Sequence, residues 1–312
     1  MNNTEKNSSY EVNLFELLNI LWMKKIMLIS ITATFAIGSV LYALSLPNIY
    51  KSKTLLAPSE QSESLLSSLG SYTSLVGGMI PFPTGAVNKS QEAVERIKSF
   101  DFFEMNILPN IKLQDLMAVK RWASDQNTII YNQKIFDDKN NKWVRKVNFP
   151  QLPQPSNQEA YEVFSNIIEI DYDYVTSFVS ISIEHQSPII SKEWTDLVTA
   201  QINESMRETD IKRSQDAITF LNVQAEVTRL NELSEAISQL LESQMEMLMM
   251  ASISSEYVFR VIESPMAPEK KSSPSRSMIC ILITLFGGIL AVLISLTHHF
   301  FFSNNNPKNT FK

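Results

Sequence analysis

The sequence predicts an α+β membrane protein, in which two transmembrane helices flank a large domain built from an α/β base and a long extended helix or helical hairpin. Three observations predict this fold class: two long apolar runs without charged residues, strand-like alternation between them, and one long proline-free stretch with helical periodicity. Together these patterns divide the 312 residues into membrane-spanning and external parts.

The first apolar run extends from Ile26 to Leu46 and carries no charge over 21 residues. As a helix it would be about 31 Å long, which matches the hydrocarbon core of a bilayer. A cleaved signal peptide is disfavoured, because 25 mostly polar residues precede the run and the run is too long. We therefore expect a cytoplasmic segment over residues 1–25 and a transmembrane helix over residues 26–46.

The second apolar run extends from Met278 to about Phe302 and lacks formal charge unless one of its two histidines titrates. A buried core helix of this length and purity would be unusual, and a polar tail follows at once. We expect a second transmembrane helix over residues 278–302 and a cytoplasmic tail over residues 303–312.

The charges beside the two runs predict the topology. Lys24 and Lys25 adjoin the first run, and Lys308 and Lys312 follow the second, which favours both termini in the cytoplasm. Long loops translocate largely regardless of their charge. Residues 47–277 are therefore expected in the periplasm.

Both apolar runs carry small residues at every fourth position, a pattern that lets membrane helices approach closely. Such residues are also common in membrane helices generally, so a packing role and ordinary composition both remain open. The two stripes are Ser30, Thr34 and Gly38 in the first run, and Gly287, Ala291 and Ser295 in the second.

The first half of the loop reads as part of an α/β base. The segment IYKSKTLLAP predicts a strand that ends at Pro58, and the serine- and glycine-containing residues 59–87 predict a mobile segment. Apolar spacing predicts a helix within residues 90–120, with a break at Pro109. Strands are expected around residues 129–131 and 143–147, joined by the polar turn DDKNN.

The second half of the base has clearer start signals. Ser156 and Glu159 form a capping box that predicts a short helix, QEAYEVFSNI. The alternating, β-branched segment that follows, ending at His185, predicts one or two strands of a half-buried sheet. The base is expected to comprise residues 47–187 and 255–277, the latter beginning with the strand-like EYVFRVIE.

A long helical region is expected over residues 188–254. Ser187 and Pro188 give it an N-cap and a proline at the first helical position, and no proline interrupts it from Ile189 onward. A single helix to about residue 250 would be roughly 90 Å long, so it must stand away from the base or fold back as a hairpin. Apolar residues at heptad spacing are expected to pack between helices or subunits: Val223, Val227, Leu230, Ile237 and Leu241.

Composition excludes several function classes. A net charge of −6 gives no basic footprint for nucleic acid. The single cysteine, Cys280, lies in the second apolar run, so neither an intrachain disulfide nor a cysteine-based metal site can form. No glycine-rich loop ends in Lys-Ser or Lys-Thr, so a Walker-type nucleotide site is not expected. We expect no cofactor.

The order of these elements and several local strings resemble the Wzz-type chain-length determinants, the polysaccharide co-polymerases of bacterial envelopes. The matching strings are IYKSKTLLAP after the first span, PSNQEAYEVF, ISIEHQSP leading into the long helix, AITFLNVQ within it, and EYVFRVIESPMAPEKKSSPSR before the second span. Together they extend over nearly the whole chain. The chain lacks the P-loop domain and tyrosine-rich tail of the kinase-bearing relatives, so it resembles the short branch.

The resemblance implies a ring-like homo-oligomer in the bacterial inner membrane that acts beside a Wzy-type polymerase. It implies that the protein sets a preferred length for a lipid-linked glycan, such as lipopolysaccharide O-antigen, without being an enzyme. It also implies a functional proline-rich segment joined to the second span, made up of Pro265, Pro268, Pro274 and Arg276.

Other functions are less consistent with the residues. Glu169, Asp171 and Asp173 would share a strand face, but neighbouring carboxylates lie too close for a glycosidase pair, and the polar face of a strand explains them. His185 has no second histidine or cysteine nearby, which disfavours a metal site. A sensor would need a cytoplasmic signalling domain. The remaining alternative is a periplasmic adaptor of a secretion or efflux system, although the second span argues against it.

Overall fold

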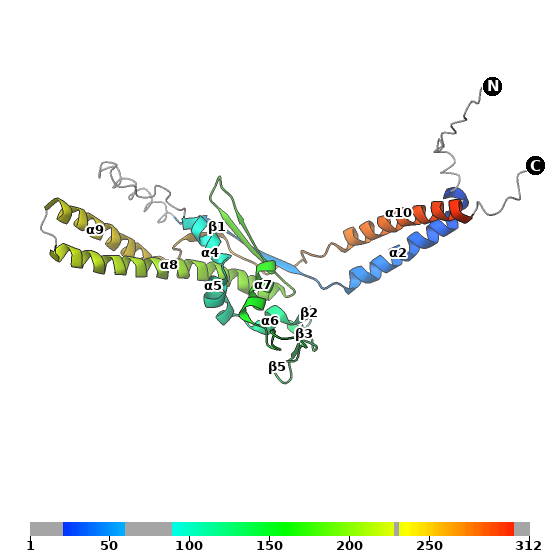
Figure 1. Ribbon diagram of the computed structural model, residues 1–312, viewed down its shortest axis with the longest axis horizontal. Coiled ribbons are helices and arrows are strands. Elements are labelled where there is room, and N and C mark those ends of the chain that lie inside the picture. The colour runs from blue at the N-terminus through cyan, green and yellow to red at the C-terminus, as the bar shows by residue number, and fades with distance from the viewer. Residues whose placement is uncertain (1–20, 60–88, 228–230, 303–312) are drawn as a thin grey trace, which may run out of the picture. The chain divides into compact units, whose positions relative to one another are not determined.

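A computed structural model describes residues 21–59, 89–227 and 231–302, without the side chains of residues 231–232 and 299–302 (Figure 1). The chain divides into two compact units. One consists of Met1–Pro47 and Ser273–Lys312, and the other of Asn48–Ser272. The serine- and glycine-containing segment expected over residues 59–87 lies, except for Ser59, outside the described residues.

The first unit is an antiparallel pair of helices, α2 (Lys25–Ser45) and α10 (Arg276–Phe302). Both are long and apolar enough to cross a membrane, over Lys25–Ser45 and Arg276–His298. The helices pack against each other. Arg276 donates a hydrogen bond to the Leu46 carbonyl at one end (3.3 Å), and Lys24 Nζ lies 3.4 Å from His298 Nδ1 at the other.

The second unit is built on a four-stranded antiparallel sheet with the order β6-β7-β1-β8 (Figure 1). Its strands are β1 (Tyr50–Pro58), β6 (Ile168–Tyr172), β7 (Val179–His185) and β8 (Phe259–Glu263). The strand after the first span is thus central, between β7 and the strand that returns toward the second span. Tyr50 pairs with His185 and Leu56 with Val179, whereas pairing with β8 shifts between Leu55 and Leu56.

One face of the sheet is covered and the other is polar. The core face is packed by α8 (Pro188–Val227), with α4 (Lys89–Ile97) and α7 (Asn157–Ile167) contributing to the same core. Alternation sends Ile181 and Ile183 of β7 into this core. On the opposite face Lys51 of β1 forms an ion pair with Glu169 of β6. The predicted α/β base is confirmed.

The capping box begins α7 as predicted. The Ser156 side chain accepts a hydrogen bond from the Glu159 N–H (3.2 Å), and the Glu159 carboxylate accepts one from the Ser156 N–H (3.0 Å). Arg145 also donates to Glu159 (2.5 Å). This bond holds the pKa of the Glu159 carboxyl below its usual value and outweighs burial, which acts in the opposite direction.

The helix expected within residues 90–120 is broken into short pieces. After α4 the chain forms α5 (Phe100–Phe102), a π turn η1 (Phe103–Ile107), a 3₁₀ turn η2 (Leu108–Asn110) and α6 (Leu113–Met117). Ser99 caps the restart by accepting from Phe102 N–H, and Pro109 cannot donate within a helix. The end of the range is corrected as well, because Val119 and Lys120 belong to a strand.

Residues 111–155, the small lobe, contain α6 and two hairpins. One pairs β2 (Val119–Ala123) with β3 (Thr128–Tyr131), and the other pairs β4 (Phe136–Asp137) with β5 (Lys142–Trp143). The DDKNN turn therefore joins β4 to β5, whereas the strand expected around residues 129–131 pairs with β2 and the one expected over 143–147 ends at Trp143. Asn127 and Asn141 adopt positive φ in these turns, which asparagine tolerates better than most residues. Strand β2 was not predicted, since its sequence VKRWA has a charged centre.

The long helical region folds back as a hairpin, which confirms one of the two predicted arrangements. Helix α8 packs against α9 (Asn231–Ile253), and residues 228–230 between them lie outside the described part. In α8 the buried side chains end at Ser214. The last third of α8 is therefore held mainly by α9 rather than by the base.

Candidate functional site: the helical hairpin and its root

The root of the hairpin is fixed by a buried polar cluster of Lys89, Asp210 and Tyr257. Lys89 donates to the Asp210 carboxylate (2.8 Å) and to the Tyr257 hydroxyl (2.9 Å), and Tyr257 donates to the same carboxylate (2.8 Å). Asp210 is 7% exposed and Tyr257 is 1% exposed. Burial, together with the hydrogen bond to Asp210, raises the pKa of the Tyr257 hydroxyl.

Asn203 of α8 fixes the segment that returns from the hairpin to the sheet. Its side-chain oxygen accepts from the Val258 and Phe259 N–H groups (2.9 and 2.8 Å), and its amide nitrogen donates to the Phe259 carbonyl (3.0 Å). Ser59 binds the same segment through the Tyr257 carbonyl (2.7 Å). Sequence reasoning missed these contacts. The signals in the sequence were an amide and a carboxylate on the face of α8 that also carries Trp194, Val198, Ile202 and Met206.

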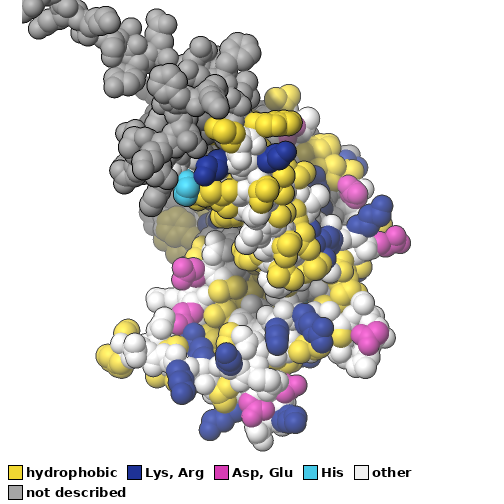
Figure 2. Space-filling view, turned by 90° about the vertical axis from the view of Figure 1, so that its right-hand side faces the viewer, with side chains coloured by type: hydrophobic (Ala, Val, Ile, Leu, Met, Phe, Trp, Pro, Cys, Tyr) yellow, Lys and Arg dark blue, Asp and Glu magenta, His cyan; other side chains and the backbone are white. Residues whose placement is uncertain are grey.

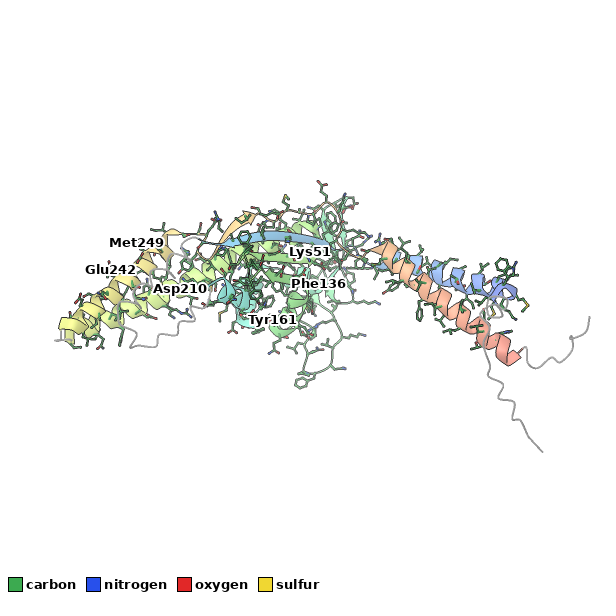
Figure 3. All side chains as sticks on the ribbon, turned by 90° about the horizontal axis from the view of Figure 1, so that it is seen from above. Lys51, Phe136, Tyr161, Asp210, Glu242 and Met249 are labelled. Atoms are coloured by element: carbon green, nitrogen blue, oxygen red, sulfur yellow. The ribbon has the colours of Figure 1, made fainter. Side chains whose placement is uncertain are left out.

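Beyond the root, the hairpin exposes apolar and acidic side chains together. Glu242 and Met249 both lie on α9 (Figure 3). The predicted packing residues divide into two groups: Val223 and Val227 are 56% and 67% exposed, whereas Ile237 is 7% exposed and Leu241 is half-buried. Leu230 lies outside the described residues. Packing of Val223 and Val227 against another subunit stays a prediction.

The proline segment lies beside the first residues of β1. Strand β8 ends at Glu263, and Pro265 has no N–H with which to continue the ladder. Hydroxyl groups of β1 bind the segment instead: Thr54 donates to the Glu263 carbonyl (2.7 Å) and Ser52 to the Met266 carbonyl (2.9 Å). Pro265 is buried and Pro268 half-buried.

Pro274 and Arg276, the other two residues of the predicted proline segment, belong to the helical unit. Arg276 begins α10 and donates to the Leu46 carbonyl just after α2. The predicted group is therefore divided between the two units, and a shared role stays a prediction.

The small-residue stripes of the two spans differ in exposure, and the second stripe is the one that packs between the helices. Ala291 and Ser295 are fully buried on α10, and a Cβ at Gly287 would lie 2.4 Å from the Cβ of Phe35. The face of α2 that meets α10 includes Phe35 and the buried Ser39 and Ala43.

The first stripe is exposed instead. Ser30, Thr34 and Gly38 are all exposed, and a Cβ at Gly38 would meet nothing within 4 Å. Within this helical pair, then, the two predicted stripes do not face each other. A contact of the first stripe with a different helix stays a prediction.

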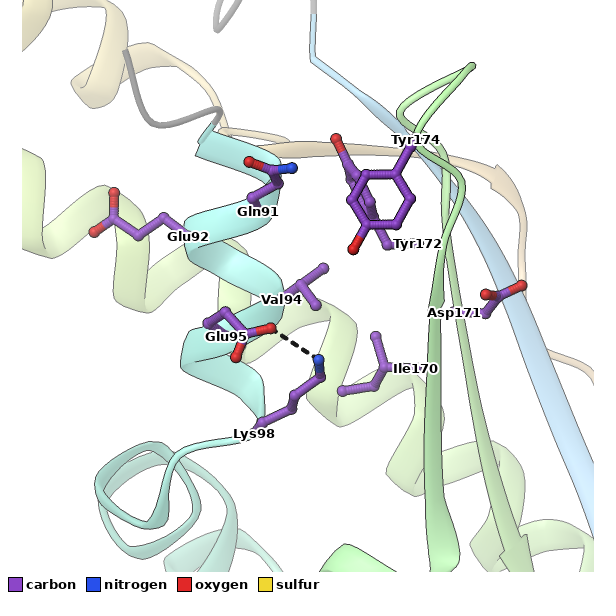
Figure 4. Close-up of a pocket in the computed structure, with 9 residues that line it drawn as sticks. All are labelled: Gln91, Glu92, Val94, Glu95, Lys98, Ile170, Asp171, Tyr172 and Tyr174. Atoms are coloured by element: carbon purple, nitrogen blue, oxygen red, sulfur yellow. Dashed lines mark hydrogen bonds and ion pairs between the residues drawn. The ribbon is translucent and has the colours of Figure 1, made fainter. Parts of the chain in front are cut away.

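An open depression of about 600 Å³ lies between α4 and β6 (Figure 4). Tyr172 and Tyr174, whose rings are 5.0 Å apart, face Gln91 and Glu95 of α4 across it. Lys98 pairs with Glu95 at 2.8 Å. Aromatic rings beside amide and carboxylate groups suit a polar ligand. Among the described residues that line the depression, none is a serine, threonine, cysteine or histidine that could act as a nucleophile.

The three carboxylates on the predicted strand face have separate surroundings. Glu169 pairs with Lys51, whose hydrogen bond lowers the pKa of this carboxyl. Asp173 accepts from the Val175 N–H (2.8 Å) and the Thr176 hydroxyl (2.8 Å), so it caps the β6–β7 turn. Asp171 is exposed and lines the depression.

His185 is buried at the end of β7. Its Nε2 lies 2.9 Å from the Asp115 carbonyl, and its Nδ1 accepts from the Ser187 N–H (2.9 Å). A neutral ring with a proton on Nε2 satisfies both contacts, and burial lowers its pKa. No group of three or more potential metal ligands occurs within the described ranges.

Comparison with known proteins gives one family match. Residues 10–138 match the model described as "Wzz: Chain length determinant protein". Among solved structures, a full-length bacterial polysaccharide co-polymerase is similar over 95% of this chain and 100% of its own, at 15% identity and a TM-score of 0.39. A fragment of WzzB, a polysaccharide co-polymerase from Salmonella Typhimurium, is similar over 72% of this chain and 100% of its own, at 10% identity and a TM-score of 0.27. No curated protein matches.

The family match begins before α2 and includes β1, α4 and the small lobe as far as Asp138. It therefore contains the first matching string, IYKSKTLLAP, while the other four strings lie after it. Over residues 10–138, the chain is therefore similar to the Wzz chain length determinant family.

Proposed function

We propose that this chain is a non-enzymatic polysaccharide co-polymerase that regulates the chain length of a surface polysaccharide, with lipopolysaccharide O-antigen as the first glycan to test. It acts as a homo-oligomeric scaffold beside a Wzy-type polymerase and its lipid-linked glycan. The observation that carries this proposal is the family match over residues 10–138. The architecture supports it, since the chain has two candidate spans and a long helical hairpin.

The proposed location is the bacterial inner membrane, with residues 47–277 in the periplasm. Two helices of spanning length and the lysines beside the first of them support this topology. The residues at the start of β1 are hydrogen-bonded to the segment before the second span, since Ser52 donates to the Met266 carbonyl and the Ser272 N–H to the Ile49 carbonyl. The chain therefore enters and leaves the base at neighbouring positions.

Self-association is supported by the apolar surface of the hairpin. Its exposed large apolar residues include Phe220, Val223, Val227, Met249 and Ile253, all more than half exposed in one chain. Apolar surface of this kind on an external helix is typical of an interaction site. We infer that the hairpins of neighbouring copies cover it.

In the proposed mechanism the hairpin is a rigid surface that is repeated around the oligomer. The root cluster and the Asn203 contacts hold this surface at a fixed orientation to the base. Polymerase or growing glycan would be retained on the repeated surface for a limited number of additions. Length is then controlled by binding and release, with no bond made or broken by this chain.

The test of the function is the ladder of envelope polysaccharide from cells with and without the gene, resolved by repeat number. Deletion should spread a clustered ladder into a random distribution while total polymer persists, and the wild-type gene should restore the cluster. An unchanged ladder would overturn the proposal and leave the adaptor function to be pursued.

The role of the hairpin is tested with Val223→Asp combined with Val227→Asp. The double variant should lower the oligomeric mass of the purified protein and broaden the ladder, because charges would replace contact surface. Val175→Asp is the matched control, since Val175 is 92% exposed in the β6–β7 turn. Equal effects of the variant and the control would contradict a specific hairpin contact.

A further inference from the structure

The small lobe differs from the rest of the chain in charge. Residues 111–155 contain eight lysines and arginines against four aspartates and no glutamate, whereas the whole chain has a net charge of −6. Figure 2 shows one side of the molecule, and Lys and Arg side chains are spread over the lower part of this view, where the small lobe lies. The lobe is thus a basic region on an acidic protein.

The acidic groups of the lobe are largely used within it. Asp115 accepts from the Tyr131 hydroxyl (2.5 Å), Asp138 from the Gln133 amide (2.9 Å), and Asp137 from the N–H groups of its own turn. The hydrogen bonds donated by Asn140, chiefly from its side chain, lower the pKa of Asp137.

The basic groups point outward instead. Arg145 pairs with Glu159. The other seven are exposed and form no ion pair with any described residue: Lys112, Lys120, Arg121, Lys134, Lys139, Lys142 and Lys146. The outward charge of the lobe is therefore positive.

The lobe is fastened to the end of the sheet that the first span reaches. The Trp122 ring packs edge-on against Tyr50, with centroids 5.6 Å apart. The Asp115 carbonyl is bonded to His185, which is the partner of Tyr50 in the sheet. Tyr50 follows Ser45, the last residue of α2, by only five residues, so the chain allows at most about 18 Å between them in any orientation of the two units.

Apolar side chains accompany this charge. After β5, Phe149 is 94% exposed and Leu152 is 66% exposed. Exposed aromatic and aliphatic groups among lysines are characteristic of surfaces that lie at the membrane interface.

We propose that the small lobe binds the anionic phospholipid headgroups of the membrane that holds the two spans. The inference rests on the proposed membrane insertion but not on the glycan function. Charge attraction to a lipid surface falls off within a Debye length, about 8 Å at physiological salt, so the lobe must approach the lipid surface closely. The link of at most about 18 Å from Ser45 to Tyr50 keeps the sheet near the end of the first span and permits this approach. The contact would help to hold the base close to the bilayer.

The test uses the full chain in nanodiscs and measures, by mass spectrometry, the rate at which each lysine is acetylated. Discs of equal parts phosphatidylglycerol and phosphatidylcholine are compared with discs of phosphatidylcholine alone. Lys112 and Lys120 are close in sequence to Asp115 and Trp122, which contact the sheet. They should react about fivefold more slowly in the anionic discs, the effect expected for one lysine at an anionic surface. About 1 M salt should remove the difference.

Lys212, exposed on α8, is the internal control and should react equally in both discs. Equal rates for Lys112 and Lys120 in the two discs would overturn the proposal. Slow reaction of both lysines in detergent as well would also overturn it, since a neighbouring copy would then cover them. Co-purification of the chain with the discs reports membrane insertion separately, and the polysaccharide ladder reports the glycan function.

Discussion

Replacing Asp210 by alanine should loosen the root of the hairpin. The substitution removes the shared acceptor of Lys89 and Tyr257 and leaves a lysine whose side chain is only 18% exposed without its anionic partner. Breaking a buried pair typically costs about 3–5 kcal/mol. The lower end applies here, about 3 kcal/mol, because Lys89 keeps some solvent and its contact with the Tyr257 hydroxyl.

For a unit of this size, about 3 kcal/mol corresponds to a fall in Tm of roughly 6–12 °C. The assay is thermal unfolding of the full-length protein in detergent, followed by tryptophan fluorescence, with hydrogen exchange across α9 as a local measure. Asp216→Ala, at an exposed position further along α8, is the control and should change Tm by little. If Asp210→Ala unfolds within about a degree of this control, the cluster does not stabilise the root and the reasoning fails.

Three further changes follow from particular contacts. Ser156→Ala should lower the free energy of unfolding by about 1 kcal/mol in the same melt, whereas Ser156→Thr, which keeps the cap, should be nearly neutral. Burial holds the folded-state pKa of His185 below 6.5, so the stability that the neutral ring contributes is complete above that pH and is lost as the pH falls. Acidification should therefore lower the Tm of the wild-type protein, and should lower the Tm of His185→Gln less. Equal dependence of Tm on pH in the two proteins would refute this prediction. Gly287→Ala should destabilise the helical pair by about 1–3 kcal/mol through its clash with Phe35, while Gly288→Ala, with open space at its Cβ, should not.

Most elements of the fold follow from local patterns. The hydroxyl and carboxylate of the capping box lie three residues apart, and the proline after Ser187 marks the start of α8, so both helix starts are readable from a few residues. The spans are readable from apolar length alone. Strand β2 was missed because tertiary packing of Trp122 on Tyr50, not periodicity, determines its conformation.

The contacts that build the candidate site depend on residues far apart in the chain. Lys89 and Asp210 are separated by 121 positions, and Asn203 binds backbone groups 55 and 56 positions later. Periodicity could place Asp210 and Asn203 on α8 but could not supply their partners. For the same reason the small-residue stripe of the first span was predictable as a pattern, whereas the face of α2 that meets α10 was not.

The central place of β1 has a consequence for synthesis of the protein. Its first partner, β7, is made about 130 residues later, and its second, β8, about 200 residues later, just before the second span emerges from the ribosome. The hairpin of α8 and α9 can form from neighbouring residues, but the sheet cannot close until almost the whole chain exists. Strand β1 therefore has unpaired edges through most of translation, and such long-range pairing favours slow closure of the sheet and exposes these edges to misfolding.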